Sequence, residues 1–155
     1  MKNKQDELLV QLLQTEWTLL EASVETLKLS VEKCNSIGLK SEYNFDEQES
    51  FDSLSSKFNR TSDLFTQKVI RTIWMLLHES FVPFIDRMNI GEKMGLLHTA
   101  NEMIEIRDMR NQIAHEYIPD AIQYLVPEII EMTRQLIVNI NCCRIFLAGR
   151  KWILG

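Results

Sequence analysis

Residues 9–34, LVQLLQTEWTLLEASVETLKLSVEKC, decide the fold class, because their apolar positions recur every three or four residues. This spacing places one apolar stripe along a helix, where it can face a core. No Gly or Pro interrupts residues 5–35, so we predict one long amphipathic helix there. Gly38 should end it, since glycine readily takes the left-handed conformation just past a helix. The stripe consists of Leu9, Leu13, Trp17, Leu20, Val24, Leu27, Val31 and Cys34.

Two more helical stretches occupy the middle of the chain. The second helix is predicted from Asp46 to about Ser80 and is long enough to bend, with Asp46 and Glu49 as its start signal. Pro83 and the run Asn-Ile-Gly at 89–91 predict a connection. Residues 96–115 then keep the helical spacing and form the third helix.

The last helix follows the break at Pro119-Asp120 and is predicted from Ile122 to Cys143, with Pro127 opening its main part. Four principal helices with short connections are typical of an up-and-down bundle. We therefore predict an all-α fold, a four-helix bundle with room for extra short helices, as one domain over residues 1–155.

Composition narrows the function classes. The three cysteines have neither metal-ligand spacing nor the pattern of a disulfide framework, and no signal or membrane segment is evident, so we expect a cytoplasmic protein without a metal or cofactor. The net charge of −5 and the pI near 5.2 argue against a generally basic nucleic-acid-binding surface. Any contact with RNA must be local, and an acidic surface also suits a basic partner protein.

The third helix carries the candidate site. Its apolar stripe of Leu96, Ala100, Met103 and Ile104 continues as Arg107, Asn111, Ala114 and His115, so polar groups take over a face expected to be buried. A separate apolar side is formed by Ile106, Met109 and Ile113. Buried polar groups without partners are costly, so these side chains should meet ligands or one another. Ordinary ion pairs with Glu105, Asp108 or Glu116 remain an equally good structural explanation.

Other polar residues receive structural interpretations. His78 and His98 have no further metal ligands at suitable spacing, so we expect them to be structural or exposed. Lys57, Arg60, Lys68 and Arg71 give the second helix positive charges that could guide RNA, but Asp52 and Asp63 interleave with them, which favours a solvated face.

The segment Arg110-Asn111-Gln112-Ile113-Ala114-His115-Glu116-Tyr117 resembles the R-x-x-x-x-H-x-Y signature of HepT-like toxins in the HEPN family. The resemblance is close over residues 107–127 and loose over the whole predicted bundle. It implies a homodimer in which two copies of the motif face each other and form one composite ribonuclease site without a metal.

Arg110 and His115 would be the catalytic pair in such a site. Arginine can hold a phosphate through its planar fork and offset the charge that develops on it. Histidine can move a proton to or from a ribose hydroxyl or a leaving oxygen at neutral pH. Asn111 and Arg107 would play supporting roles. Tyr117 would position RNA or accept adenylyl groups from a partner nucleotidyltransferase that acts as the antitoxin; its structural alternative is packing where the chain leaves the helix.

Three functions are therefore compatible with the sequence. The first is a toxin-like endoribonuclease that cleaves RNA by attack of the 2′-hydroxyl group. The second is a non-catalytic subunit that binds a nucleotidyltransferase or a nucleotide, because similar motifs occur in such subunits of the family. The third is a helical dimerisation module in which Arg110 and His115 are structural.

Overall fold

A computed structural model describes residues 3–116, 118 and 121–154 of the chain. The described residues form helices and contain no strand, which confirms the all-α fold class. The segments are α1 (Lys4–Ile37), α2 (Phe45–Asp63), the π-helical segment η1 (Leu64–Val69), α3 (Ile70–Leu76), α4 (Phe84–Lys93), α5 (Ala100–Ala114) and α6 (Ile122–Gly149).

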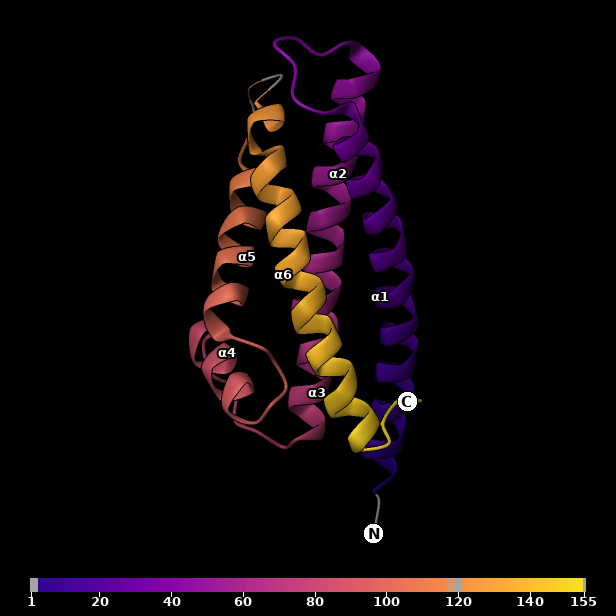
Figure 1. Ribbon diagram of the computed structural model, residues 1–155. Helices are drawn as coiled ribbons and strands as arrows, with labels where there is room; N and C mark the ends of the chain where they lie inside the picture. Colours follow the sequence, from indigo (N-terminus) through magenta and orange to yellow (C-terminus); the bar gives the residue numbers. More distant parts are fainter. Residues whose placement is uncertain (1–2, 117, 119–120, 155) are drawn as a thin grey trace.

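The long helices run side by side as a bundle (Figure 1). The segments α2, η1 and α3 follow one another without a break, because the residues at both junctions keep right-handed helical dihedral angles. This composite helix packs against α1, and its α2 part also packs against α5 and α6. The two ends of α1 and α6 nearest the chain termini lie at the same end of the bundle (Figure 1).

The helix boundaries follow local capping chemistry. Gly38 follows the last residue of α1 with a positive φ of 74°, as predicted for a glycine at the helix end, but its ψ of −173° lies outside the left-handed helical conformation. Asn44 caps α2 by accepting from the Glu47 backbone N–H, and the Glu47 side chain accepts from the Asn44 backbone N–H. The capping box therefore lies two residues before the predicted start signal at Asp46 and Glu49.

The second helix, which we predicted to be long enough to bend, changes its helix type in the middle. Residues Leu64–Val69 form the wider π-helical hydrogen-bonding pattern, and Thr66 Oγ1 additionally donates to the Ser62 carbonyl oxygen at 2.9 Å. π-helical turns within α-helices are frequent at functional sites. The α-helical pattern resumes at Ile70 and ends at Leu76, a few residues before the predicted end at Ser80.

The connection predicted around residues 89–91 is wrong, because these residues lie inside the short helix α4. Gly91 fits there through close packing: a Cβ atom at this position would lie 3.0 Å from Leu97 Cδ1. Residues 96–99, predicted to be helical, belong to the connection between α4 and α5. Pro127 lies inside α6, which begins at Ile122, so it does not open the main part of that helix.

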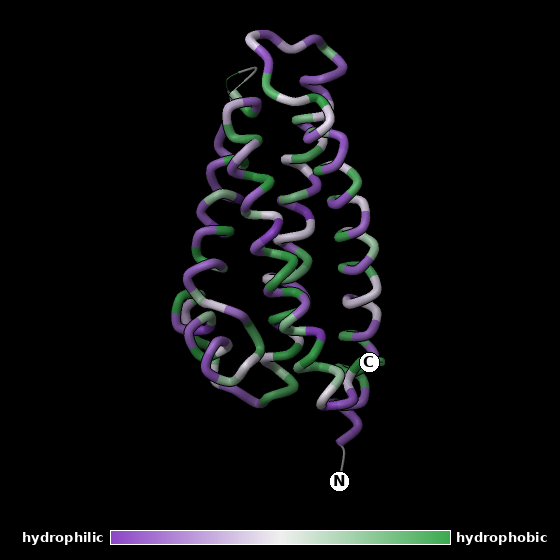
Figure 2. The backbone as a smooth tube through the Cα atoms, in the orientation of Figure 1, coloured by the Kyte–Doolittle hydropathy of each residue, from purple (hydrophilic) through white to green (hydrophobic). Residues whose placement is uncertain are grey.

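The core runs along the centre of the bundle. Hydrophobic and hydrophilic residues alternate along every long helix (Figure 2), and the apolar positions of the first helix, the second helix and α6 meet inside. Leu13, Leu20, Phe58, Phe65 and Leu136 are fully buried. In the described part of the chain, the helices are all too short or too polar to cross a membrane.

Candidate functional site

Helix α5 buries one side in the core and exposes the other side to solvent. Ile106, Met109 and Ile113 are buried, as the sequence predicts. The polar stripe differs from the expectation, because Asn111 and His115 are exposed and only Arg107 is half-buried. Because Asn111 and His115 are exposed, these polar side chains are accessible to a ligand or to another molecule.

Arg110 is held by a carboxylate from another helix. Its Nε donates to Asp63 Oδ1 at 3.0 Å, and its Nη2 donates to Asp63 Oδ2 at 2.9 Å. These hydrogen bonds, together with the charge of Asp63, raise the pKa of the Arg110 guanidinium against the opposing effect of partial burial. The side chain of Asn59 donates to the Arg110 carbonyl oxygen at 3.4 Å, which links the same turn of α5 to α2.

The predicted partners of the arginines are only partly correct. Asp108 lies 3.6 Å from Arg107, whereas Arg110 pairs with Asp63 and not with Glu105, Asp108 or Glu116. The guanidinium carbon of Arg107 also lies 4.6 Å from the centre of the Phe84 ring. The ion-pair explanation thus holds for Arg110, although its partner is distant in the sequence.

His115 ends α5. Its backbone N–H donates to the Asn111 carbonyl oxygen at 3.1 Å, and its φ and ψ of −99° and 5° lie where the helical conformation is lost. Its exposed imidazole makes no hydrogen bond to any of the described residues, including Asn111, for which a supporting role was predicted. Tyr117 lies outside the described residues.

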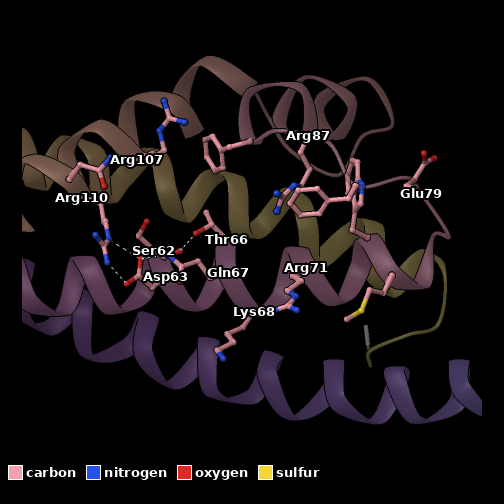
Figure 3. Close-up of a pocket in the computed structure, with 15 residues that line it drawn as sticks. Ser62, Asp63, Thr66, Gln67, Lys68, Arg71, Glu79, Arg87, Arg107 and Arg110 are labelled. Carbon is pink, nitrogen blue, oxygen red and sulfur yellow. Dashed lines mark hydrogen bonds and ion pairs between the residues drawn. The ribbon is translucent and has the colours of Figure 1, made fainter.

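A groove of about 690 Å³ lies beside the arginines, between the composite second helix and the pair α4 and α5. Figure 3 shows Arg107 and Arg110 at one end and Arg87 and Glu79 toward the other. Among the described residues that line it, five side chains are cationic and two are acidic. The cations are Lys68, Arg71, Arg87, Arg107 and Arg110, and the acids are Asp63 and Glu79.

Some of the predicted site residues line the groove and others do not. Asn111, Arg107 and Arg110 belong to its lining, whereas His115 is not among the described residues that do. Lys68 and Arg71, interpreted as part of a solvated face, are exposed and line the groove as well. Arg87 and the aromatic residues beside it were not predicted to belong to the site. Their sequence signal is the spacing of Phe81, Phe84 and Arg87, three residues apart.

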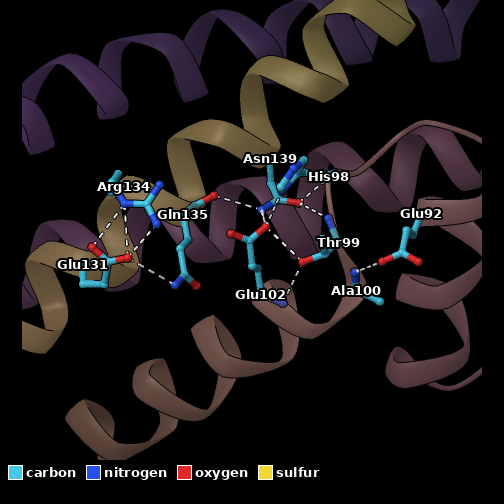
Figure 4. Close-up of polar contacts among 9 residues, drawn as sticks. All are labelled: Glu92, His98, Thr99, Ala100, Glu102, Glu131, Arg134, Gln135 and Asn139. Atoms are coloured by element: carbon cyan, nitrogen blue, oxygen red, sulfur yellow. Dashed lines mark hydrogen bonds and ion pairs between the residues drawn. The ribbon is translucent and has the colours of Figure 1, made fainter.

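A polar network fixes where α5 begins (Figure 4). The buried side chain of Asn139 on α6 accepts from the backbone N–H groups of His98 and Thr99 at 2.9 and 3.3 Å. Glu102 accepts from the Thr99 hydroxyl at 2.9 Å and contacts His98 Nδ1 at 2.6 Å. Although burial disfavours the charged carboxylate, hydrogen bonds from His98, Thr99 and Asn139 outweigh it and lower the pKa of Glu102.

The remaining candidate residues have structural roles. His98 belongs to this network, and the exposed His78 contacts Asp6 at 3.1 Å, in line with the structural interpretation of both histidines. The described residues contain no group of three or more His, Cys, Asp or Glu side chains placed to hold a metal ion. All three cysteines are free, and burial raises the pKa of each thiol.

Comparison of this chain with protein-family models, with curated proteins and with solved structures found no match.

Proposed function

We propose that this protein is a toxin-like, metal-independent endoribonuclease of a toxin–antitoxin system, active as a homodimer in the cytoplasm. The observation that carries the proposal is that both residues of the R-x-x-x-x-H pair are accessible. His115 is exposed at the end of α5, and Asp63 holds Arg110 at the edge of a groove rich in cations, on a chain whose net charge is −5. The local positive charge meets the requirement that an acidic protein contact RNA at one place only.

The geometry of α5 favours a site shared by two subunits. Arg110 and His115 are five residues apart, which corresponds to about 7.5 Å along a helix axis and about 140° around it. A single subunit therefore directs the two side chains away from each other. Two subunits related by a twofold axis can bring the arginine of one close to the histidine of the other. Asn111 and His115 are exposed among the described residues, which supports such a contact on this side of α5.

In the proposed reaction, a neutral His115 imidazole takes the proton of the ribose 2′-hydroxyl. The 2′-oxygen then forms a bond to phosphorus, and the bond from phosphorus to the 5′-oxygen of the next nucleotide breaks. A protonated imidazole of the second subunit returns a proton to that leaving oxygen. The products are a 2′,3′-cyclic phosphate and a 5′-hydroxyl end, and DNA is inert because it lacks the attacking group.

Arg110 would stabilise the negative charge that builds up on the phosphate during attack. Asp63 occupies its Nε and Nη2 atoms, which leaves Nη1 to point toward a ligand and fixes the plane of the guanidinium group. Arg107, held over Phe84, and Asn111 would assist by binding the neighbouring phosphate or orienting the imidazole. A nucleotidyltransferase antitoxin would silence this site by adenylylating Tyr117.

The decisive experiment is cleavage of a defined RNA by purified protein in EDTA, with His115→Ala and Arg110→Ala as variants. Gln112→Ala, an exposed residue between them, is the matched control. We expect cyclic-phosphate products from the wild type and the control, and a loss of at least about a hundredfold in rate for both variants. If the His115→Ala variant cleaves RNA at the wild-type rate, and its circular dichroism spectrum shows that it is folded, this result would falsify the proposal.

A second candidate is a non-catalytic subunit that binds a nucleotidyltransferase or its substrate. The observation that favours it is that His115 lies outside the groove lining while Arg110 is already paired with Asp63. This alternative predicts that folded wild-type dimers leave every RNA intact yet form a stable complex with a co-expressed nucleotidyltransferase. The same cleavage assay, followed by size-exclusion chromatography of the co-expressed pair, separates the two functions.

A further inference from the structure

The groove beside α5 extends well beyond the predicted catalytic pair. One wall runs from Ser62 on α2 to Glu79 after α3, and its helical part, which ends at Leu76, corresponds to about 21 Å of helix. Figure 3 shows the cationic side chains spread along this length, so they do not converge on a single point. A site for one phosphate group would gather its donors around one centre, whereas a strand needs a contact every few ångströms.

Most of the positive charge in the groove is uncompensated. Asp63 neutralises Arg110, but no carboxylate of the described residues lies within 4.0 Å of the charged groups of Lys68, Arg71 or Arg87. Lys68 and Arg71 are exposed and three residues apart, so they share one face of the helix. These charges therefore remain available to an anionic ligand.

Arg87 provides an independent sign of a missing ligand. Its Nε atom is buried and has no hydrogen-bond partner in the described part of the chain, and its Nη2 reaches the Val82 carbonyl oxygen only at 3.5 Å. Burial lowers the pKa of this guanidinium, which means that its charged form is poorly solvated where it lies. A phosphate group that contacts the guanidinium from the groove would offset part of this lost solvation.

Aromatic rings accompany the cations. The Arg87 guanidinium carbon lies 5.3 Å from the centre of the Phe81 ring, yet Phe81 is 87% exposed. The ring therefore keeps a large free surface on which a nucleobase can stack. Phe84, beneath Arg107, adds a second ring to the same wall. Cationic side chains for the backbone and aromatic surfaces for the bases are the usual combination in sites for single strands.

We propose that the groove between the composite second helix and α4 and α5 binds single-stranded nucleic acid, through phosphate contacts to Lys68, Arg71 and Arg87 and base stacking on Phe81. The inference rests on the proposed function in one respect only, which is that a strand bound in the groove would lead to Arg110 as a catalytic residue. None of these contacts reads the 2′-hydroxyl, so the groove accepts DNA and RNA alike. Single-stranded DNA would then be an uncleaved competitor of the RNA substrate.

The test uses a fluorescein-labelled single-stranded DNA of roughly 12 nucleotides, whose binding to the full chain is followed by fluorescence anisotropy. DNA cannot be cut by 2′-hydroxyl attack, so binding is measured whether or not the protein is a ribonuclease. Lys68→Gln/Arg71→Gln removes two groove charges. Lys28→Gln/Lys33→Gln removes two exposed charges of α1 that do not line the groove and serves as the control.

We expect the groove variant to bind roughly tenfold more weakly than the wild type, and the control to bind as the wild type does. The slope of log K against log salt should become less steep by about 1.4 when two phosphate contacts are lost. Phe81→Ala should weaken binding without changing that slope. Inorganic phosphate and AMP should compete only at much higher concentrations than the oligonucleotide.

Several results would overturn the assignment. These are absence of DNA binding at low salt, equal losses in the groove variant and the control, displacement by AMP as effective as by DNA, or RNA binding more than about tenfold tighter than DNA. The proposed function fails separately: DNA binding in the groove without RNA cleavage would leave the groove assignment intact. Conversely, the wild type could cleave RNA without binding DNA, and Lys68→Gln/Arg71→Gln could cleave RNA at the wild-type rate. That result would retain the ribonuclease assignment and reject the assignment of the groove as a nucleic-acid-binding site.

Discussion

Asp63 at the end of α2 and Arg110 on α5 meet through two parallel hydrogen bonds of 3.0 and 2.9 Å, across 47 positions of sequence. Both side chains are about one-third exposed. A pair this open to solvent contributes little to folding, typically below about 1 kcal/mol. Its geometry nevertheless fixes the direction of the arginine, so its main effect should be on function.

Replacing Asp63 with Ala should therefore lower the RNA cleavage rate about tenfold at saturating substrate, because Arg110 loses its fixed plane. The melting temperature should change by only a few degrees. Asp63→Glu, which keeps the carboxylate, should restore part of kcat. Single-turnover kinetics and thermal denaturation of the wild type, Asp63→Ala and Asp63→Glu measure the cleavage rates and the melting temperatures. A change in KM alone, or no change in rate, would show that Asp63 does not position a catalytic group.

Asn139 should be required for stability. Its buried oxygen accepts from two backbone N–H groups before α5, and Ala would leave both without that partner. We expect Asn139→Ala to lower the free energy of unfolding by about 2 kcal/mol, seen as a fall of roughly 4–8 °C in Tm. Asn141→Ala, two residues further along α6 and exposed, is the control and should stay within about 1 °C of the wild type. Equal losses in the two variants would contradict this role.

Glu102 should make stability depend on acidity. Its pKa is lowered in the folded protein, so its ionised form stabilises the fold above the ordinary glutamate pKa of about 4.3. That contribution is lost as the pH falls through the lower, folded-state pKa. Wild type should thus be more stable than Glu102→Gln near pH 7, and the difference should disappear in acid. Urea unfolding at several pH values checks this, with Glu105→Gln on the exposed side of α5 as control. A pH-independent difference would assign the effect of Glu102 to packing.

The cysteines should differ in reactivity by their burial. Cys34 and Cys143 are buried, and Cys142 is only partly so. The raised pKa values leave little thiolate at neutral pH, so we expect slow labelling of native protein by iodoacetamide, confined to Cys142. Peptide mass mapping locates the label, and Cys142→Ser should leave the native protein unlabelled. Rapid labelling of Cys34 before unfolding would contradict the packing of α1 on α2.

Helical periodicity carried most of the information about the fold. The stripe around Leu13 and Trp17 predicted α1, and the apolar side of Ile106, Met109 and Ile113 predicted how α5 faces the core. Helix α4 was not predicted, because Pro83 and the Asn-Ile-Gly run at 89–91 are typical of turns and were interpreted as a connection. In the structure Pro83 precedes the first residue of the helix and Gly91 is buried against Leu97.

The candidate site was less accessible to sequence reasoning. The motif residues Arg110 and His115 could be selected, but the pairing of Arg110 with Asp63 joins distant positions and leaves no periodic signal. The groove was likewise unpredictable, because Arg71, Arg87 and Arg107 come from three separate segments and meet only through packing. Periodicity reports which side of a helix is apolar and not which neighbouring helix will face its polar side.

The π-helical segment η1 ties the groove to the core in a way that constrains how the protein can change. A regular α-helix turns by about 100° per residue, whereas a π-helical turn accommodates one extra residue. Deleting one residue of η1 would thus convert the segment into regular α-helix and would keep Ile70 and Ile73 in the core and Arg71 beside the groove. Deleting one residue from the α-helical part of α2 would instead rotate all three by about 100°, so η1 is the place where this helix can change its length without losing either the interior or the groove.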